Sequence, residues 1–173
     1  MESPNKGLLE SQFNAYYEQH FHQIHRYIYR LIGNIEEAEQ LAQQAFAGFF
    51  THLLSSPKMD DVRPLLFRIA TNASLNYINK HRKTKEALNK MPLPDTANDD
   101  PLEQTIIRQQ KSLIQNGLAQ LKPRDRECVL LYTEGLSYSE IAHVIGAKRT
   151  TVGKILSRAI ERLTLQVRKG DGQ

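Results

Sequence analysis

The stretch GLSYSEIAHVIGAKRTTVGKILSRAIERL, residues 135–163, contains two helical patterns separated by a glycine. In the first pattern Ser137 is placed to cap the helix, and Glu140 completes a capping box. Gly146 predicts the end of that helix, because glycine adopts a positive φ without steric cost. A second helix is expected to begin at Thr150 or its neighbour. Helix, tight turn and helix together predict a helix-turn-helix.

The second helix of this motif is basic, whereas the first is not. In a helix-turn-helix the second helix enters the major groove, and its N-terminal residues meet base edges. Long cations also supply phosphate attraction, which carries much of the affinity. We therefore predict DNA contact through Lys148, Arg149, Thr150, Thr151, Lys154 and Arg158. The alternative is an ordinary bundle in which this charged face is merely solvated.

The first 85 residues show helical apolar spacing without strand alternation. One helix is expected over Ser11–Ile32, stopped by Gly33. A second follows Asn34 as its N-cap, with Glu37 as the capping-box partner. A third is expected to be capped by Asp60 or Asp61 and to run to about Lys83. The apolar face predicted for this third helix consists of Leu65, Leu66, Ile69, Ala70, Ala73, Tyr77 and Ile78.

A proline- and aspartate-rich segment, KMPLPDTANDDP at residues 90–101, separates the two helical regions. It has little to bury, so it is interpreted as an extended linker. Further helix is expected over Leu102–Leu121, and another helix opens at Pro123. The predicted fold is all-α, with two small helical domains joined by a flexible linker. The predicted boundaries are 8–86 for the first domain, 87–104 for the linker and 105–169 for the second domain.

Bulk properties exclude several classes of protein. The net charge of +4 suits a polyanion partner without proving one. Cys128 is the single cysteine, so an internal disulfide framework is excluded and a reducing, cytoplasmic location is expected. The N-terminus lacks a signal peptide's apolar core, and no apolar run is long enough to insert into a membrane. His20, His22 and His25 lie close together, but their spacing gives one helical pair, so no metal site is predicted.

Three motif blocks lie in order along the chain. They are GNIEEAEQLAQQAF at 33–46, LFRIATNASLNYINKHRK at 66–83, and LAQLKPRDRECVLLYTEGLSYSEIAHVIGAKRTTV at 118–152. With these blocks the chain resembles a bacterial RNA polymerase sigma factor of the sigma-70 family, in its compact extracytoplasmic-function (ECF) group. The resemblance covers roughly Phe13 to Leu165.

The resemblance implies a function in transcription initiation. The N-terminal domain (sigma region 2) would bind core RNA polymerase and open the promoter −10 element, and the C-terminal domain (region 4) would bind the −35 element. The implied partners are core RNA polymerase through its beta and beta' subunits, promoter DNA, and in many family members an anti-sigma factor. No cofactor and no catalytic activity of its own are implied.

The resemblance also implies site residues. The block RIATN places Asn72 where the family reads an unstacked base, and Asn76 lies one helical turn further on. The residues implied in −10 binding are Arg68, Asn72, Asn76, Lys80, Arg82 and Lys83. Those implied in core polymerase binding are Glu36, Glu37, Glu39, Gln40, Gln43, Gln44 and Phe46.

Departures from the family pattern leave two alternatives. Gln40 and Gln44 stand where the family usually has acidic residues, Leu65 where a tryptophan is common, and Gly153 where a basic residue is typical. One alternative is a helix-turn-helix regulator that binds duplex DNA without polymerase. The other is a sigma-like interaction protein that binds polymerase or an anti-sigma factor without initiating transcription.

Overall fold

The structure, a computed structural model, describes residues 4–56, 61–81 and 113–170 of the chain. All regular structure within these residues is helical, which confirms the predicted all-α class. The proposed linker, together with Arg82 and Lys83, lies outside the described residues. Across the described ranges, no helix is long and apolar enough to cross a membrane.

Helix α1 spans Pro4–Ile32, so it begins earlier than the predicted Ser11. Its buried face includes Ile24, Tyr27 and Ile28, each completely shielded from solvent. Gly33 ends the helix with a φ of 77°, a conformation that glycine adopts freely. The predicted stop is therefore confirmed.

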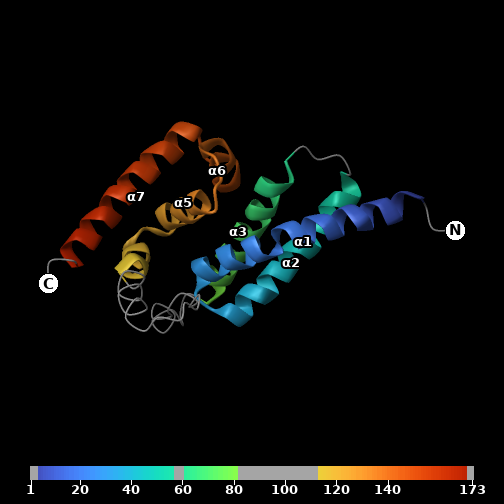
Figure 1. Ribbon diagram of the computed structural model, residues 1–173, viewed down its shortest axis with the longest axis horizontal. Coiled ribbons are helices and arrows are strands. Elements are labelled where there is room, and N and C mark those ends of the chain that lie inside the picture. The colour runs from blue at the N-terminus through green and yellow to red at the C-terminus, as the bar shows by residue number, and fades with distance from the viewer. Residues whose placement is uncertain (1–3, 57–60, 82–112, 171–173) are drawn as a thin grey trace, which may run out of the picture.

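Helix α2 spans Ile35–Ser55 and packs along α1 (Figure 1). Asn34 is its N-cap, as predicted, and the Asn34 side chain accepts a hydrogen bond of 3.1 Å from the Glu37 backbone N–H. Aromatic rings fill the space between α1 and α2, including Phe13, Tyr17 and Phe46. This cluster packs the N-terminal half of α1 against the C-terminal half of α2.

Helix α3 spans Val62–Lys80 and completes the first bundle. Asp61 occupies the predicted N-cap position, but its side chain makes no capping hydrogen bond. The buried face of α3 is also rotated about the helix axis relative to the predicted one. Leu66 and Ala70 are buried as expected, but the remaining buried residues of this helix are Pro64, Phe67, Thr71 and Ser74. The other five predicted residues are only half-buried.

The second bundle consists of a helical segment at 113–120, α5 (Pro123–Thr133), α6 (Tyr138–Ile145) and α7 (Arg149–Gly170). Helix α5 begins at Pro123, as predicted, because proline suits the first helical turn. Buried side chains of α5, α6 and α7 meet in its core, among them Cys128, Ile141 and Leu156.

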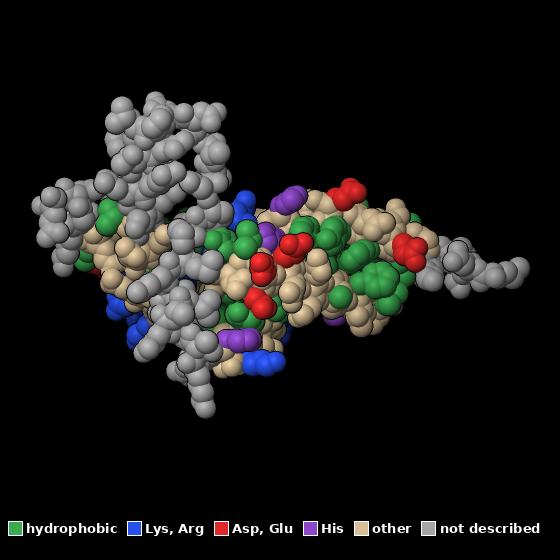
Figure 2. All heavy atoms as spheres, turned by 90° about the horizontal axis from the view of Figure 1, so that it is seen from below, with side chains coloured by type: hydrophobic (Ala, Val, Ile, Leu, Met, Phe, Trp, Pro, Cys, Tyr) green, Lys and Arg blue, Asp and Glu red, His purple; other side chains and the backbone are tan. Residues whose placement is uncertain are grey.

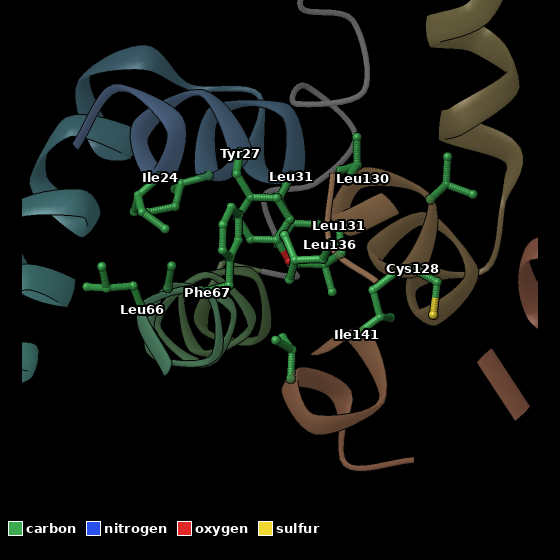
Figure 3. Close-up of a cluster of buried hydrophobic side chains, with 14 of the residues drawn as sticks. Ile24, Tyr27, Leu31, Leu66, Phe67, Cys128, Leu130, Leu131, Leu136 and Ile141 are labelled. Atoms are coloured by element: carbon green, nitrogen blue, oxygen red, sulfur yellow. The ribbon is translucent and has the colours of Figure 1, made fainter. Parts of the chain in front are cut away.

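The two bundles touch one another. Helix α3 packs against α6, and α1 packs against α5. Tyr27 and Phe67 of the first bundle lie beside Leu131, Leu136 and Ile141 of the second (Figure 3), and the buried apolar side chains form one continuous cluster. This contact was not predicted, since the pairing residues lie far apart along the chain.

Candidate DNA and polymerase interfaces

The outer face of α3 carries the predicted −10 residues. Arg68, Asn72, Asn76 and Lys80 follow one another at every fourth position, and all four are exposed. Residues four apart lie on neighbouring turns of one helix face. This stripe lies opposite the buried face of α3, so the contact between the bundles leaves both asparagines open to solvent.

Packing of α3 against α1 fixes this orientation. The Tyr27 ring meets the Phe67 ring edge-to-face, with centroids 5.1 Å apart. The Tyr27 and Thr71 hydroxyls form a buried hydrogen bond of 2.8 Å, and the Ser74 hydroxyl donates to the Ala70 carbonyl at 2.8 Å. Because Thr71 is held inward, its neighbour Asn72 faces outward.

One exposed residue of this face was not singled out from the sequence. Asn79 lies seven residues after Asn72, which is almost two full helical turns, and it too is exposed. Together the three asparagines offer amide groups that both donate and accept hydrogen bonds. The seven-residue spacing was the signal that could have identified Asn79.

The helix-turn-helix forms as the sequence predicts. The Ser137 hydroxyl accepts from the Glu140 backbone N–H at 3.2 Å, and the Glu140 carboxylate accepts from the Ser137 backbone N–H at 2.7 Å. Gly146 then takes a φ of 63° and ends α6. Partial burial raises the pKa of Glu140, but the bonds from Ser137 and the charge of Arg63 outweigh it, so the pKa lies below its ordinary value.

Helix α7 presents the predicted −35 residues at its N-terminal end. Its apolar side holds Val152, Ile155 and Leu156 in the core. The residues predicted to contact DNA, all of them exposed, are Lys148, Arg149, Thr150, Thr151, Lys154 and Arg158. No described acidic residue is paired with them, so these cations are available to phosphate.

Gly153 stands where the family pattern has a basic residue. A Cβ atom added there would lie 3.6 Å from the Tyr138 ring, which is ordinary van der Waals contact. Packing alone therefore does not demand glycine at this position. Gly153 is half-buried and faces Tyr138 of α6, so it lies on the packing side of α7 and not on the exposed basic surface.

The outer face of α2 carries six of the seven residues predicted to bind core polymerase. Of these, Glu37 is half-buried and the others, Glu36, Glu39, Gln40, Gln43 and Gln44, are exposed. Phe46 is 1% exposed and packs against Phe13, Tyr17 and Phe21. Phe46 thus supports the helix from within and offers no surface for direct contact.

Acidic and apolar side chains lie close together on the half of the molecule formed by α1 and α2 (Figure 2). Large hydrophobic residues on this half are unusually exposed, with Leu8 at 59%, Leu54 at 52% and Ile35 at 51%. Ile35 immediately precedes the glutamates of the α2 face. Ile35 and Leu54 stand at opposite ends of α2, so these exposed residues do not form one apolar patch.

Comparison with known proteins identifies the family. The model of Sigma-70 region 2 matches residues 16–84, and that of Sigma-70 region 4 matches residues 111–163. RNA polymerase sigma factor YlaC of Bacillus subtilis is 30% identical over 147 residues, which cover 83% of this chain and 84% of YlaC. The chain belongs to the sigma-70 family. The region 2 match falls on α1, α2 and α3, and the region 4 match includes α5, α6 and most of α7.

Other sigma-70 proteins match over most of their length. ECF RNA polymerase sigma factor SigM of Bacillus subtilis is 26% identical over 157 residues, covering 89% of this chain and 94% of SigM. Among solved structures, the sigma factor RpoE of Bartonella quintana, crystallised with the anti-sigma factor NepR, shares the fold. The TM-score is 0.69 at 19% identity, and the match covers 91% of this chain and 97% of that one.

Proposed function

We propose that this sigma-70 protein acts as an alternative-type sigma factor: it binds core RNA polymerase, recognises the −10 and −35 elements, and promotes promoter melting. The observation that carries the proposal is that the residues predicted to contact DNA are exposed on two faces, one on α3 and one on α7, in a chain that matches both sigma-70 regions. Polymerase supplies the chemistry, so no catalytic role is assigned to the chain. It is proposed to act in the cytoplasm.

The face of α3 is proposed to capture the melted −10 strand. Unstacked bases expose their edges, and polar side chains read those edges. Asn72 and Asn76 supply amide groups, while Arg68 and Lys80 flank them with charge for the phosphates. Melting costs about 1.4 kcal/mol per stacked step. Base capture on this face must offset that cost, and Arg82 and Lys83 are proposed to add charge beyond the described helix.

The N-terminal end of α7 is proposed to read the −35 duplex. Lys148, Arg149, Thr150, Thr151 and Lys154 occupy the end of the helix that enters the major groove in this motif. Arg158 lies one turn beyond Lys154 and is proposed to contact phosphate.

Helix α2 is proposed to bind core polymerase through Glu36, Glu37, Glu39, Gln40, Gln43 and Gln44. The domains are proposed as 8–86 for region 2, 87–104 for the linker and 105–169 for region 4. Three of these six residues are neutral glutamines, which favours weaker or differently tuned binding to the polymerase than a fully acidic face would give. An anti-sigma partner is proposed as well, since RpoE of Bartonella quintana was crystallised with one.

In vitro transcription with purified core polymerase on a library of candidate promoters tests this proposal. Transcripts with defined start sites are expected only when the chain is added. Duplex binding without any effect on polymerase would instead identify a stand-alone regulator. Core binding without transcripts would identify a sigma-like interaction protein, for which Gln40 and Gln44 are the best support.

A further inference from the structure

Aromatic rings are scarce on the outer side of α3, all of whose residues the structure describes. The helix carries two aromatic residues, Phe67 and Tyr77, and Phe67 is completely buried against Tyr27. The predicted −10 stripe consists of arginine, asparagine and lysine side chains. Such side chains read the edges of unstacked bases, but they do not replace the stacking that a base loses when it leaves the duplex. Tyr77 is the aromatic residue of α3 that reaches the surface.

The half-buried Tyr77 ring is paired with the ring of His81, the C-cap residue of α3. The two ring centroids lie 4.2 Å apart, and the ring planes are inclined by 30°. Partial burial raises the pKa of the Tyr77 phenol, and the charge of Glu37 on α2 adds to the shift, so the phenol is neutral. One face of the His81 ring is thus covered by a neutral aromatic ring.

A hydrogen bond fixes the His81 ring in this position. Its Nδ1 atom lies 2.9 Å from the Tyr77 carbonyl oxygen. Because a carbonyl only accepts, Nδ1 carries the proton, and Nε2 of the neutral ring is left as an acceptor. The same carbonyl already accepts the His81 backbone N–H at 3.0 Å. The bond from the ring is therefore not needed to satisfy the helix end, and its effect is to orient the imidazole.

The part of the His81 ring that stays open suits a nucleic acid. The residue is half-exposed, one ring face lies against Tyr77, and Nδ1 is turned to the helix. The remaining exposure belongs to the second face and to the Nε2 edge. No described residue forms a hydrogen bond with Nε2. An open aromatic face stacks on unstacked bases, and a free acceptor takes an N–H from a base edge.

The ring pair of Tyr77 and His81 lies at the end of the predicted −10 stripe. The exposed residues Asn76 and Lys80 immediately precede Tyr77 and His81 in the chain. From Asn72 to His81 the helix rises by about 14 Å. A strand that is bound by the two asparagines and continues towards the C-terminal end of α3 therefore reaches the ring pair next. Lys80 lies beside the pair and offers a cation to phosphate.

We propose that His81, supported by Tyr77, is a base-stacking residue of the −10 site. One unstacked base packs on the open face of the imidazole, and a neighbouring base donates an N–H to Nε2. The inference rests on the proposed function, because it requires that α3 binds the melted strand. The amides of Asn72 and Asn76 read base edges, whereas the ring pair holds the strand by stacking, which tolerates any base. Stacking on His81 thereby contributes to offsetting the cost of melting.

Photo-crosslinking in the complex of core polymerase with the full-length chain tests the stacking contact. A pre-opened promoter carries 5-iodouracil at one position at a time through the −10 element and its flanks. Iodouracil crosslinks under long-wavelength ultraviolet light to an aromatic ring that stacks on it, and mass spectrometry identifies the linked residue. A crosslink to His81 is expected from one position of the melted strand. Crosslinks confined to other parts of the chain would overturn the assignment.

Substitutions at His81 separate stacking from helix capping. His81→Ala should lower the affinity of the polymerase complex for the pre-opened promoter by about tenfold. His81→Phe keeps a stacking ring but cannot donate to the Tyr77 carbonyl, and it should retain most of the affinity. His81→Gln can donate to that carbonyl but has no ring, and it should behave like the alanine variant. The reverse order, with glutamine active and phenylalanine inactive, would show a capping role and overturn the proposal.

His22→Ala, at an exposed histidine of α1, is the matched control and should leave the affinity unchanged. Urea denaturation of each variant verifies that the fold is intact. Start-site-specific transcription by wild type together with equal affinities for wild type and His81→Ala would overturn the stacking role alone. If wild type gives no start-site-specific transcripts with core polymerase, the proposed function is overturned and the stacking role with it.

Discussion

The hydroxyl oxygens of Tyr27 and Thr71 lie 2.8 Å apart in the buried seam between α1 and α3. Tyr27 is completely shielded, and this desolvation raises the pKa of its phenol above the ordinary value, so it stays protonated. Thr71 is the direct neighbour of Asn72. The bond therefore fixes how α3 is turned about its own axis. This orientation points Asn72, on the face proposed to hold the −10 strand, towards solvent.

Removing one partner of this bond should cost stability. Thr71→Val keeps the side-chain shape but leaves the Tyr27 hydroxyl buried without that partner, a loss of about 1–3 kcal/mol. Urea denaturation measures the free energy of unfolding. The double variant with Tyr27→Phe removes both hydroxyls and should recover part of the loss. A Thr71→Val chain as stable as wild type would show that the bond does not hold α3.

Asn72→Ala should impair promoter opening without affecting polymerase binding. The residue is exposed, so its loss should leave the fold intact, while a lost base contact costs about 1–3 kcal/mol. Initiation assays and core-binding titrations measure the two effects separately. Asn14→Ala, an exposed asparagine of α1, is the matched control and should change neither. Loss of core affinity in the Asn72 variant would remove the role assigned to it.

Lys154→Ala should weaken binding of the polymerase-bound chain to a −35 duplex. If Lys154 contacts phosphate, the slope of log affinity against log salt concentration should also decrease in size by about one. Fluorescence anisotropy over a range of salt concentrations measures both quantities. Lys122→Ala is the control, because Lys122 is equally exposed but lies outside the recognition helix. An unchanged affinity and salt slope would contradict the placement of α7 in the groove.

Glu127 should make the folded chain less stable as the pH rises. Burial raises the pKa of its carboxyl to about 7, although Arg124 opposes the shift. A proton held more tightly in the folded than in the unfolded chain stabilises the fold at low pH. That stability is lost as pH rises from about 4.5 to about 7, by about 3 kcal/mol in total.

Glu127→Gln removes this titration while keeping the side-chain shape. The stability of the variant relative to wild type should therefore increase between pH 5 and pH 8, as measured by urea denaturation at each pH. Glu161→Gln, at an exposed site, should show no such trend. A constant difference between the Glu127 variant and wild type across this range would show that the carboxyl titrates normally.

Local signals predicted much of the fold. The Ser137 and Glu140 capping box, the left-handed Gly146 and the Asn34 cap each depend on neighbours within four residues, and each is present. Such features depend only on residues close together in the chain, so they can be recognised in a single sequence.

Features that depend on tertiary packing were missed. The face of α3 was predicted from hydrophobicity, yet polar Thr71 and Ser74 are buried because Tyr27 and the helix backbone satisfy their hydroxyls. The contact of Glu134 with Arg26 joins residues 108 positions apart. Phe46 was assigned to polymerase binding although three rings from α1 enclose it. Each of these features depends on residues of another helix, so the residues next to it in the chain do not reveal it.

Promoter opening by the reconstituted polymerase is the most direct test of the central claim, that α3 holds a melted −10 strand while α7 holds the −35 duplex. Permanganate modifies unstacked thymines, so a promoter found in the transcription library is treated with core polymerase alone and with core polymerase plus this chain. The account predicts reactive thymines at the −10 element only with the chain present, and far fewer with Asn72→Ala. Equal reactivity with and without the chain would contradict it.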